Sequence, residues 1–210
     1  FHVPNKKITA DMMVYLPQRE YDYIRSNTFN GDVSFKDLHT RDIYVKSTNG
    51  EILLNNIQAS MLEVKGTNGD ITLKDAELRD LLINTVNGDL RVVGYVQSSD
   101  VNTTNGTVRL TLIGEDLIRV AGSSINGDVK VSLPKEVGLE VDAKTTFGKI
   151  KSRLSNTDST QHVAVKGRTQ RFRRIGTGEV CRVNLQTTTG NVLLKDTDKE
   201  TATNVDSEEE

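Results

Sequence analysis

The most regular candidates for chemistry in this 210-residue chain are carboxylates that directly follow repeated Asn-Gly turns. They are Asp32, Glu51, Asp70, Asp89 and Asp128. Stacked on neighbouring strands, such oxygens could share Ca²⁺. However, Asp is also a favoured turn residue, and calcium-binding roll repeats have denser glycine and an Asp about every nine residues. The pattern therefore favours a role in the turn, and we predict no metal or other cofactor.

Candidates for catalysis are few. The histidines His2, His39 and His162 occupy unrelated positions without metal-ligand spacing. Cys181 stands beside Val180 and Val183, so we expect a buried structural thiol. No nucleotide-binding or nucleophile motif is present. A polysaccharide lyase would need long loops to build its cleft, and the repeats described below leave little room for them. We predict no catalytic residues and no enzyme activity.

Basic residues form a second recurring column, three positions after the turn glycines. On the outward side of four repeats stand Arg91, Arg109, Lys130 and Lys151, and a basic segment farther along adds Lys166, Arg168, Arg171, Arg173 and Arg174. These four repeats are consecutive in the sequence, so we expect the cations to stack about 4.8 Å apart on four consecutive rungs and to repel one another unless an anion offsets the charge. One interpretation is a soluble charged face. The other is a docking strip for an anionic partner, or for the acidic tail of this chain as an autoinhibitor.

These columns belong to a sequence repeat. The turn glycines are Gly31, Gly50, Gly69, Gly88, Gly106, Gly127, Gly148 and Gly190. Their spacings of 18 to 21 residues, with a final 42, indicate a solenoid. Two and four residues after each glycine, fifteen of sixteen positions are apolar, which is typical of an inward-facing strand. We predict an all-β, right-handed parallel β-solenoid of about eight short rungs, with a β-sandwich or propeller as the alternative.

The residue before the turn glycine is an asparagine in six repeats. These residues are Asn30, Asn49, Asn68, Asn87, Asn105 and Asn126. Their position has the same parity as the inward apolar columns, and Ser or Thr often stands two residues earlier. Stacked amides and hydroxyls can hydrogen-bond along the stack. We therefore predict an inward-facing asparagine ladder at a corner of every rung, where glycine supplies the unusual backbone angles.

The boundaries of the domain follow from where the repeat holds. We expect one solenoid domain over residues 1–197, with 155–179 as an irregular rung or excursion and 198–210 as a disordered acidic tail. Residues 14–33 match 131–150 column for column, with Leu16-Pro17 opposite Leu133-Pro134. Proline cannot donate to a strand ladder, so both pairs predict a strand end or an edge. The chain begins at Phe1, so we expect an excised piece.

Composition limits the partners. The net charge is −2, which favours neither nucleic acid nor an acidic membrane as a default partner. One cysteine excludes an internal disulfide framework. No apolar run approaches the roughly 20 residues of a transmembrane helix. The oligomeric state stays open.

The repeat Thr-x-Asn-Gly-Asp-[Ile/Val]-x-[Leu/Val], with "GTGEVCRVNLQTTTGNVLL" near the end, resembles the bacterial "putative adhesin" domain family. The segment "LPQREYDYIRSNTFNGDVSF" is also similar to the C-terminal β domain of LiaX-type envelope-stress proteins. The resemblance implies a non-catalytic binding or regulatory module at the bacterial cell envelope or surface, in adhesion or envelope stress response, that binds a protein or an anionic envelope component. The alternatives are a self-assembling structural solenoid, to which bactofilins are a weaker match, and a polysaccharide-binding or lyase β-helix.

Overall fold

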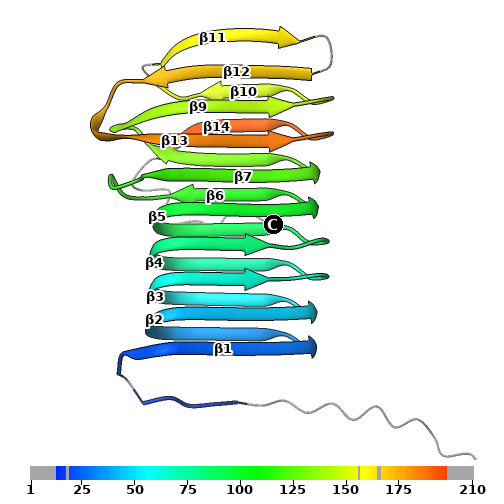
Figure 1. Ribbon diagram of the computed structural model, residues 1–210, viewed down its shortest axis with the longest axis vertical. Helices are drawn as coiled ribbons and strands as arrows, with labels where there is room; N and C mark the ends of the chain where they lie inside the picture. Colours follow the sequence, from blue (N-terminus) through cyan, green and yellow to red (C-terminus); the bar gives the residue numbers. More distant parts are fainter. Residues whose placement is uncertain (1–12, 18, 156, 165–166, 198–210) are drawn as a thin grey trace, which may run out of the picture.

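The computed structural model describes residues 13–197 except 18, 156 and 165–166. The described residues contain no helix and form one 14-stranded sheet that winds into a tall coil (Figure 1). The strands are β1 (Tyr21–Asn30), β2 (Val33–Asn49), β3 (Ile52–Lys65), β4 (Ile71–Asn84), β5 (Leu90–Asn105), β6 (Val108–Leu112), β7 (Arg119–Asn126), β8 (Val129–Pro134), β9 (Val137–Thr145), β10 (Ile150–Arg153), β11 (Thr157–Ala164), β12 (Gly167–Arg174), β13 (Thr177–Thr187) and β14 (Val192–Thr197).

Each turn of the coil consists of three runs that pair in parallel with the next turn. In β2 these runs are 33–36, 38–40 and 42–46, and each residue pairs with the one 19 positions later. The unpaired Asp37 between the first two runs has a φ of 54°, so the chain bends there. We call the side that follows the Asn-Gly corner the exit face and the side that precedes it the entry face. The predicted parallel β-solenoid is confirmed.

The core lies between these faces and is built from the columns predicted to point inward. On the entry face Val45, Val64 and Ile83 are fully buried, and on the exit face so are Leu54 and Leu73. Alternation of apolar and polar residues drives this arrangement, because burying one side of every strand removes a continuous aliphatic stack from water. Aliphatic side chains are large enough to fill this core, because each level also packs against the levels above and below it.

The number and order of levels differ from the prediction. In chain order, about six turns are formed, slightly fewer than the eight predicted, by β2, β3, β4, β5, β6 with β7, and β8 with β9. The last of these turns is irregular, because β13 lies between β7 and β9. The strands β1 and β10 are part-turns. The last level, β13 with β14, is inserted between two earlier ones: β13 pairs with β7 and β9, and β14 pairs with β8 and β10. The chain therefore skips a level after β8 and fills the gap at its end.

Residues 157–174 form an antiparallel hairpin, β11 with β12, at the upper end of the entry face (Figure 1). The strand β12 pairs antiparallel with β9, so that Phe172 lies opposite Val141 and is buried. The hairpin covers the edge of β9, which an uncapped parallel solenoid would leave exposed. The predicted acidic tail, residues 198–210, lies outside the described residues.

Candidate binding surfaces

The Asn-Gly corners stack so closely that they exclude any side chain at the glycine. Gly50, Gly69 and Gly88 have φ values between 130° and 151°. A Cβ atom at Gly88 would lie 2.1 Å from the carbonyl oxygen of Gly69, far inside van der Waals contact. Glycine therefore recurs because of both the backbone angle and the distance between levels.

The asparagine ladder is present, but it does not face inward. The Nδ2 of Asn68 donates to Oδ1 of Asn49 at 2.8 Å, and the bond repeats between neighbours along all six asparagines. The side chains lie at the outer edge of the corner, where Asn68 and Asn87 are exposed. The prediction from parity was wrong because the inward alternation ends at the Ser or Thr position two residues earlier, and the asparagine that follows lies at the edge of the corner.

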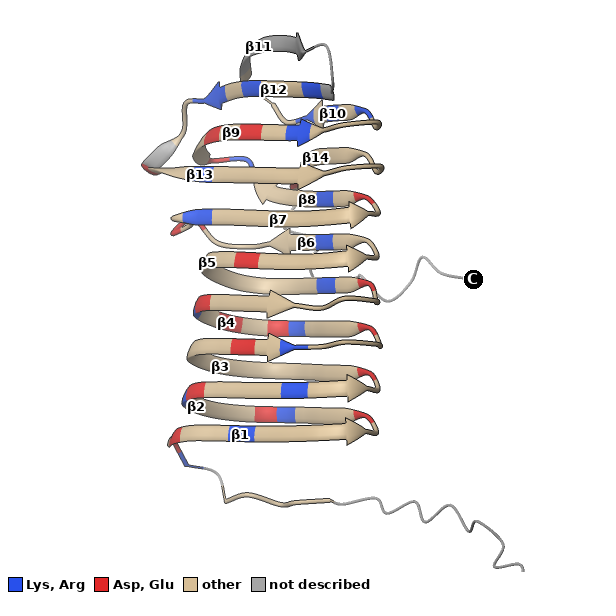
Figure 2. Ribbon diagram, turned by 45° about the vertical axis from the view of Figure 1, so that its right-hand side comes forward, with Lys and Arg blue, Asp and Glu red and all other residues tan. Residues whose placement is uncertain are grey.

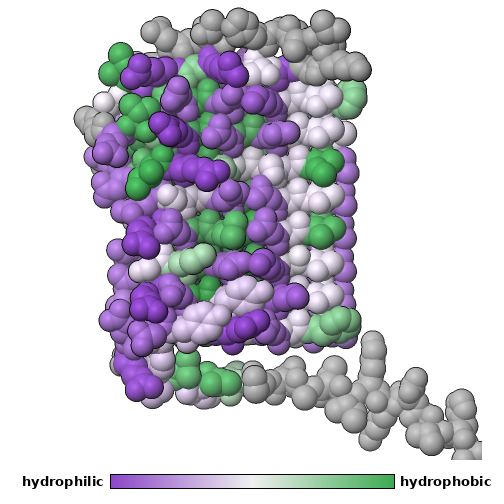
Figure 3. Space-filling model, viewed as in Figure 1, coloured by the Kyte–Doolittle hydropathy of each residue, from purple (hydrophilic) through white to green (hydrophobic). Residues whose placement is uncertain are grey.

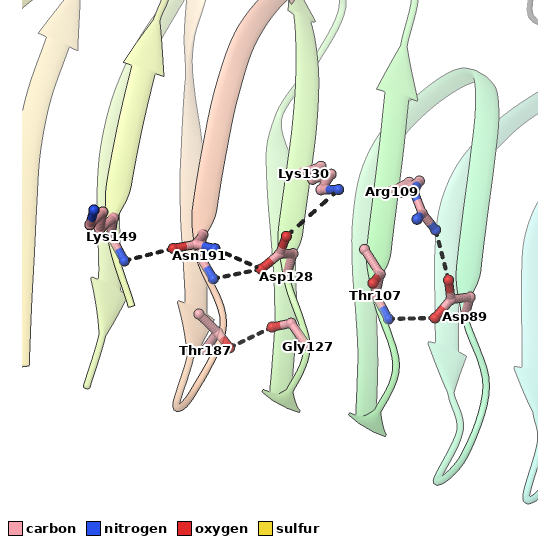
Figure 4. A network of polar contacts seen from close by, with 9 residues as sticks. All are labelled: Asp89, Thr107, Arg109, Gly127, Asp128, Lys130, Lys149, Thr187 and Asn191. Atoms are coloured by element: carbon pink, nitrogen blue, oxygen red, sulfur yellow. Dashed lines mark hydrogen bonds and ion pairs between the residues drawn. The ribbon is translucent and has the colours of Figure 1, made fainter. Parts of the chain in front are cut away.

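Hydroxyl groups two residues earlier do face inward, and several bind the corner backbone instead of one another. The hydroxyls of Ser124, Thr187 and Thr145 donate to glycine carbonyls of adjacent levels at 2.7 to 2.9 Å. Figure 4 shows the bond from Thr187 to Gly127. In this column the hydroxyls of Ser47 and Thr85 are buried, and among the described residues they have no partner. The column therefore fixes the upper corners more firmly than the lower ones.

The acidic column serves the backbone. Oδ1 of Asp32, Asp70 and Asp89 accepts the amide N–H of the residue one level above at 2.7 to 2.8 Å, and Asp128 accepts that of Asn191 in the inserted level (Figure 4). The pKa of Asp89 is shifted by two opposed effects. Burial raises it, but the Thr107 amide and the Arg109 guanidinium outweigh burial and hold it below the usual value. These carboxylates thus stabilise the turn. No group of three His, Cys, Asp or Glu residues that could hold a metal ion occurs in the described part of the chain.

The predicted cation column is interrupted. Arg91, Arg109 and Lys130 are neighbours in register on β5, β6 and β8. Because the inserted β14 lies between β8 and β10, Leu193 separates Lys130 from Lys151. Arg109 donates to Asp89 at 2.8 Å, and Lys130 lies 3.6 Å from Asp128. Figure 2 shows these blue positions on the exit face, beside the red corner carboxylates.

The top of the exit face is more strongly basic than the sequence suggested. The strands β10 and β14 place Arg153 directly beside Lys195, with Lys151 two residues away on the same outward side. All three side chains are exposed, and within the described residues none has a carboxylate at ion-pair distance. Sequence spacing could not place Lys195 here, because only the insertion of the last level brings it next to Arg153. We call Lys151, Arg153 and Lys195 the basic cluster.

The other predicted basic residues do not extend this surface. Arg171 and Arg173 are exposed on β12, which continues the entry face, the opposite side of the coil. Arg171 also lies 3.2 Å from Asp142. Arg168 is exposed at the start of the same strand, and Lys166 lies outside the described residues. Arg174 is buried and structural, because β12 turns it toward the core. The single strip predicted from the sequence is therefore divided between two faces.

A shallow groove of about 510 Å³ crosses the short side of the coil, where the runs equivalent to 38–40 stack. Its lining includes His39, Gln58, Glu77 and Tyr95, which are in register on four successive turns. The side chain of Tyr95 is exposed, and Gln58 donates to Glu77 at 3.3 Å. These residues differ in type from turn to turn, so no repeated column in the sequence predicted the groove. Their mixed charges specify no ligand class.

The remaining candidates have structural roles or fall outside the description. Cys181 is fully buried, and burial raises the pKa of its thiol to about 12, although the Arg174 charge opposes the rise. Such a thiol is a poor nucleophile. His2 lies outside the described residues, as does the side chain of His162. The described residues include no helix long and apolar enough to cross a membrane.

Comparison with known proteins gives three similarities. The profile of the family described as Toastrack DUF4097 matches residues 4–195. Uncharacterized protein YvlB of Bacillus subtilis is 46% identical over 153 residues, which are 73% of this chain and 42% of YvlB, so the chain spans less than half of that relative. A crystal structure named "putative cell adhesion protein", from Clostridium sporogenes, aligns with 86% of this chain and 93% of its own, with a TM-score of 0.34 and 10% identity. A structural similarity of this size supports no argument.

Proposed function

The chain belongs to the Toastrack DUF4097 family, and from this premise we propose that it is a non-catalytic binding module of the bacterial cell envelope that docks an anionic partner on its exit face. The observation that supports the proposal best is the basic cluster. Lys151, Arg153 and Lys195 gather on adjacent strands although the chain has a net charge of −2. Like charges held this close repel one another, and a bound anion would offset the repulsion.

The rest of the exit face supports a partner that is extended. Arg91, Arg109 and Lys130 continue the positive charge downward, about 4.8 Å apart. Arg109 and Lys130 already face carboxylates, so they contribute less net attraction than the basic cluster does. A polymer or a membrane surface with closely spaced phosphates could contact several levels at once, whereas a small anion could contact only one or two. The partner class is therefore a phosphate-rich polymer or lipid surface.

The test is binding to anionic probes of known composition. At low salt, the wild-type protein should bind vesicles that contain phosphatidylglycerol and should also bind soluble poly(glycerol phosphate). At high salt it should bind neither probe. The variant Lys151→Gln/Arg153→Gln/Lys195→Gln should keep its fold and lose binding. A matched variant, Lys46→Gln/Arg173→Gln/Arg182→Gln, removes the same charge from exposed positions on the entry face and should still bind. Equal loss in both variants, or no binding by wild type, would refute the proposal.

A self-assembling structural solenoid is the second candidate function, and one observation favours it. In the described part of the chain, β1 pairs with β2 alone, so its other edge is open to another strand. Sedimentation of wild type at several concentrations separates the two functions, because an assembling solenoid would sediment far above its 23.3 kDa mass. The envelope-stress role implied by the resemblance to LiaX-type proteins stays a prediction.

A further inference from the structure

The lower end of the solenoid is incompletely covered. Phe35 on the exit face and Leu38 just beyond the bend at Asp37 are only partly buried, whereas Leu54 and Ile57, their equivalents one level higher, have exposed fractions of 0% and 1%. The edge of β2 from Val33 to Lys36 pairs with β3 on one side and, among the described strands, with nothing on the other. This end lacks one strand that would complete the columns of the exit face.

A short apolar segment lies next to this end without joining it. Figures 1 and 2 show residues 13–17 passing below β1 and apart from it. Met13, Val14 and Leu16 are 76%, 62% and 48% exposed, and Figure 3 shows apolar atoms below the body of the molecule there. The hydroxyl of Tyr21 donates to the carbonyl of Pro17 at 2.8 Å, so the segment is held near the edge at its end.

The sequence of this segment is that of an exit-face strand. Val14, Leu16 and Pro17 correspond to Val131, Leu133 and Pro134 of β8, which are buried. Each proline precedes an inward residue of the following strand by seven positions: Pro17 precedes Ile24, and Pro134 precedes Val141. The spacing between corner segments also matches. The segment "TAD" at 9–11 stands 21 residues before the corner "NGD" at 30–32, and the corner "NGD" at 126–128 stands 21 residues before the corner "FGK" at 147–149.

We propose that residues 13–17 are an edge strand that docks on the Val33–Lys36 edge of the same chain, adding one level to the lower end. The register of β8 on β6 pairs Val131 with Leu110, four residues after a turn glycine. The same register places Val14 beside Phe35, and Leu16 then lies near Leu38. Docking would bury two exposed aliphatic side chains against the two partly buried ones, and it would pair the open backbone edge.

The chain's own segment fits this edge better than a second copy does. The connection from Pro17 to Ile24 of β1 covers seven positions, as does the connection from Pro134 to Val141 of β9, which already spans a skipped level. The connection that follows Pro17 is therefore long enough to span one level of the coil. With residues 13–17 docked there, a second copy cannot add its own strand to the Val33–Lys36 edge. The proposal is independent of the basic cluster, which lies at the opposite end of the coil.

The experiment introduces a pair of cysteines at the paired positions and measures how fast they form a disulfide. It uses the full chain with Cys181→Ala, so that the introduced cysteines are the only thiols. Val14→Cys/Phe35→Cys should form an intramolecular bond under mild oxidation, about tenfold faster than the offset pair Tyr15→Cys/Phe35→Cys, since adjacent strands place the first pair within disulfide range. Each single-cysteine variant controls for bonds between molecules. A covalent dimer would show docking in trans and overturn the proposal, and so would equal rates for the two pairs.

A second measurement does not depend on thiols. Leu16→Asp should undock the segment and expose the edge, so that the protein loses thermal stability and sediments partly as larger species. Tyr15→Asp, on the outward side of the same strand, should change neither. If Leu16→Asp and Tyr15→Asp behave alike, residues 13–17 do not cover the edge.

Discussion

Arg174 Nη1 lies 2.6 Å from Asp196 Oδ1, and this pair joins the capping hairpin to the last strand of the inserted level. The Arg174 side chain is fully buried and also donates to the carbonyls of Val137, at 2.9 Å, and Pro134. These carbonyls flank the point where the chain leaves β8 and skips a level. On its other side, Asp196 accepts the backbone N–H and the hydroxyl of Ser155. The pair therefore closes the gap that the level skip creates.

Removing one partner of this buried pair should be strongly destabilising. Arg174→Met removes the charge that pairs with the Asp196 carboxylate, which keeps only its Ser155 donors, and it removes the donor to two buried carbonyls. We therefore expect a loss of roughly 3–5 kcal/mol in the free energy of unfolding. Urea denaturation measures this loss in the free energy of unfolding. Arg173→Met, at an exposed neighbour, should change stability by less than about 0.5 kcal/mol. Similar losses in both variants would show that the pair does not hold the inserted level.

The inward hydroxyls should differ in what they contribute. Thr187 donates to the Gly127 carbonyl at 2.7 Å, so Thr187→Val should cost about 1 kcal/mol. In the described structure the Thr85 hydroxyl is buried without a partner, so Thr85→Val should be neutral or stabilising. Both changes conserve shape, and thermal melts of the two variants side by side provide the comparison. A larger loss at position 85 than at 187 would contradict the assignment.

The asparagine ladder should contribute modestly, because it is exposed. Asn87 donates to Asn68 at 2.8 Å and accepts from Asn105 at 2.7 Å. Asn87→Leu should therefore cost about 1 kcal/mol, less than a fully buried amide would. Asn30→Leu, at the end of the ladder, breaks one such bond and should cost less, and the exposed Lys46→Leu is the control. Equal urea midpoints for all three variants would argue against any contribution of the ladder to stability.

Cys181 should make stability fall at alkaline pH. Burial raises its pKa from 9.0 to about 12, so the unfolded chain loses the proton at a lower pH than the folded one. Above pH 9 the unfolded state binds fewer protons, and the free energy of unfolding decreases by about 1 kcal/mol between pH 9 and 10. Cys181→Ala should remove this part of the pH dependence. In the native wild type the thiol should also fail to react with a thiol reagent at pH 8, and a rapid reaction would show that it is accessible.

The sequence determined the unit of this structure. The spacing of Gly50, Gly69 and Gly88 specifies a coil with one corner per turn, and the period-2 columns through Val45 and Leu54 specify which side is buried. Both signals are local, since a strand's inward residues and a corner's glycine are set by a few neighbouring positions. The bend at the corner is equally local, but parity alone missed it. For that reason the asparagines formed the predicted ladder on the unexpected, outer side.

Only the tertiary structure decided the order of the levels and the grouping of the charges. Every level offers the same parallel edge, so a level formed by residues 177–197 can stack against any other, and the repeat itself does not say which. Contacts between distant residues accompany the insertion, among them the ion pair of Arg174 with Asp196. The insertion then separates Lys130 from Lys151 and brings Lys195 beside Arg153. A repeated sequence fixes each rung, whereas the positions where it fails to repeat fix the arrangement of the rungs.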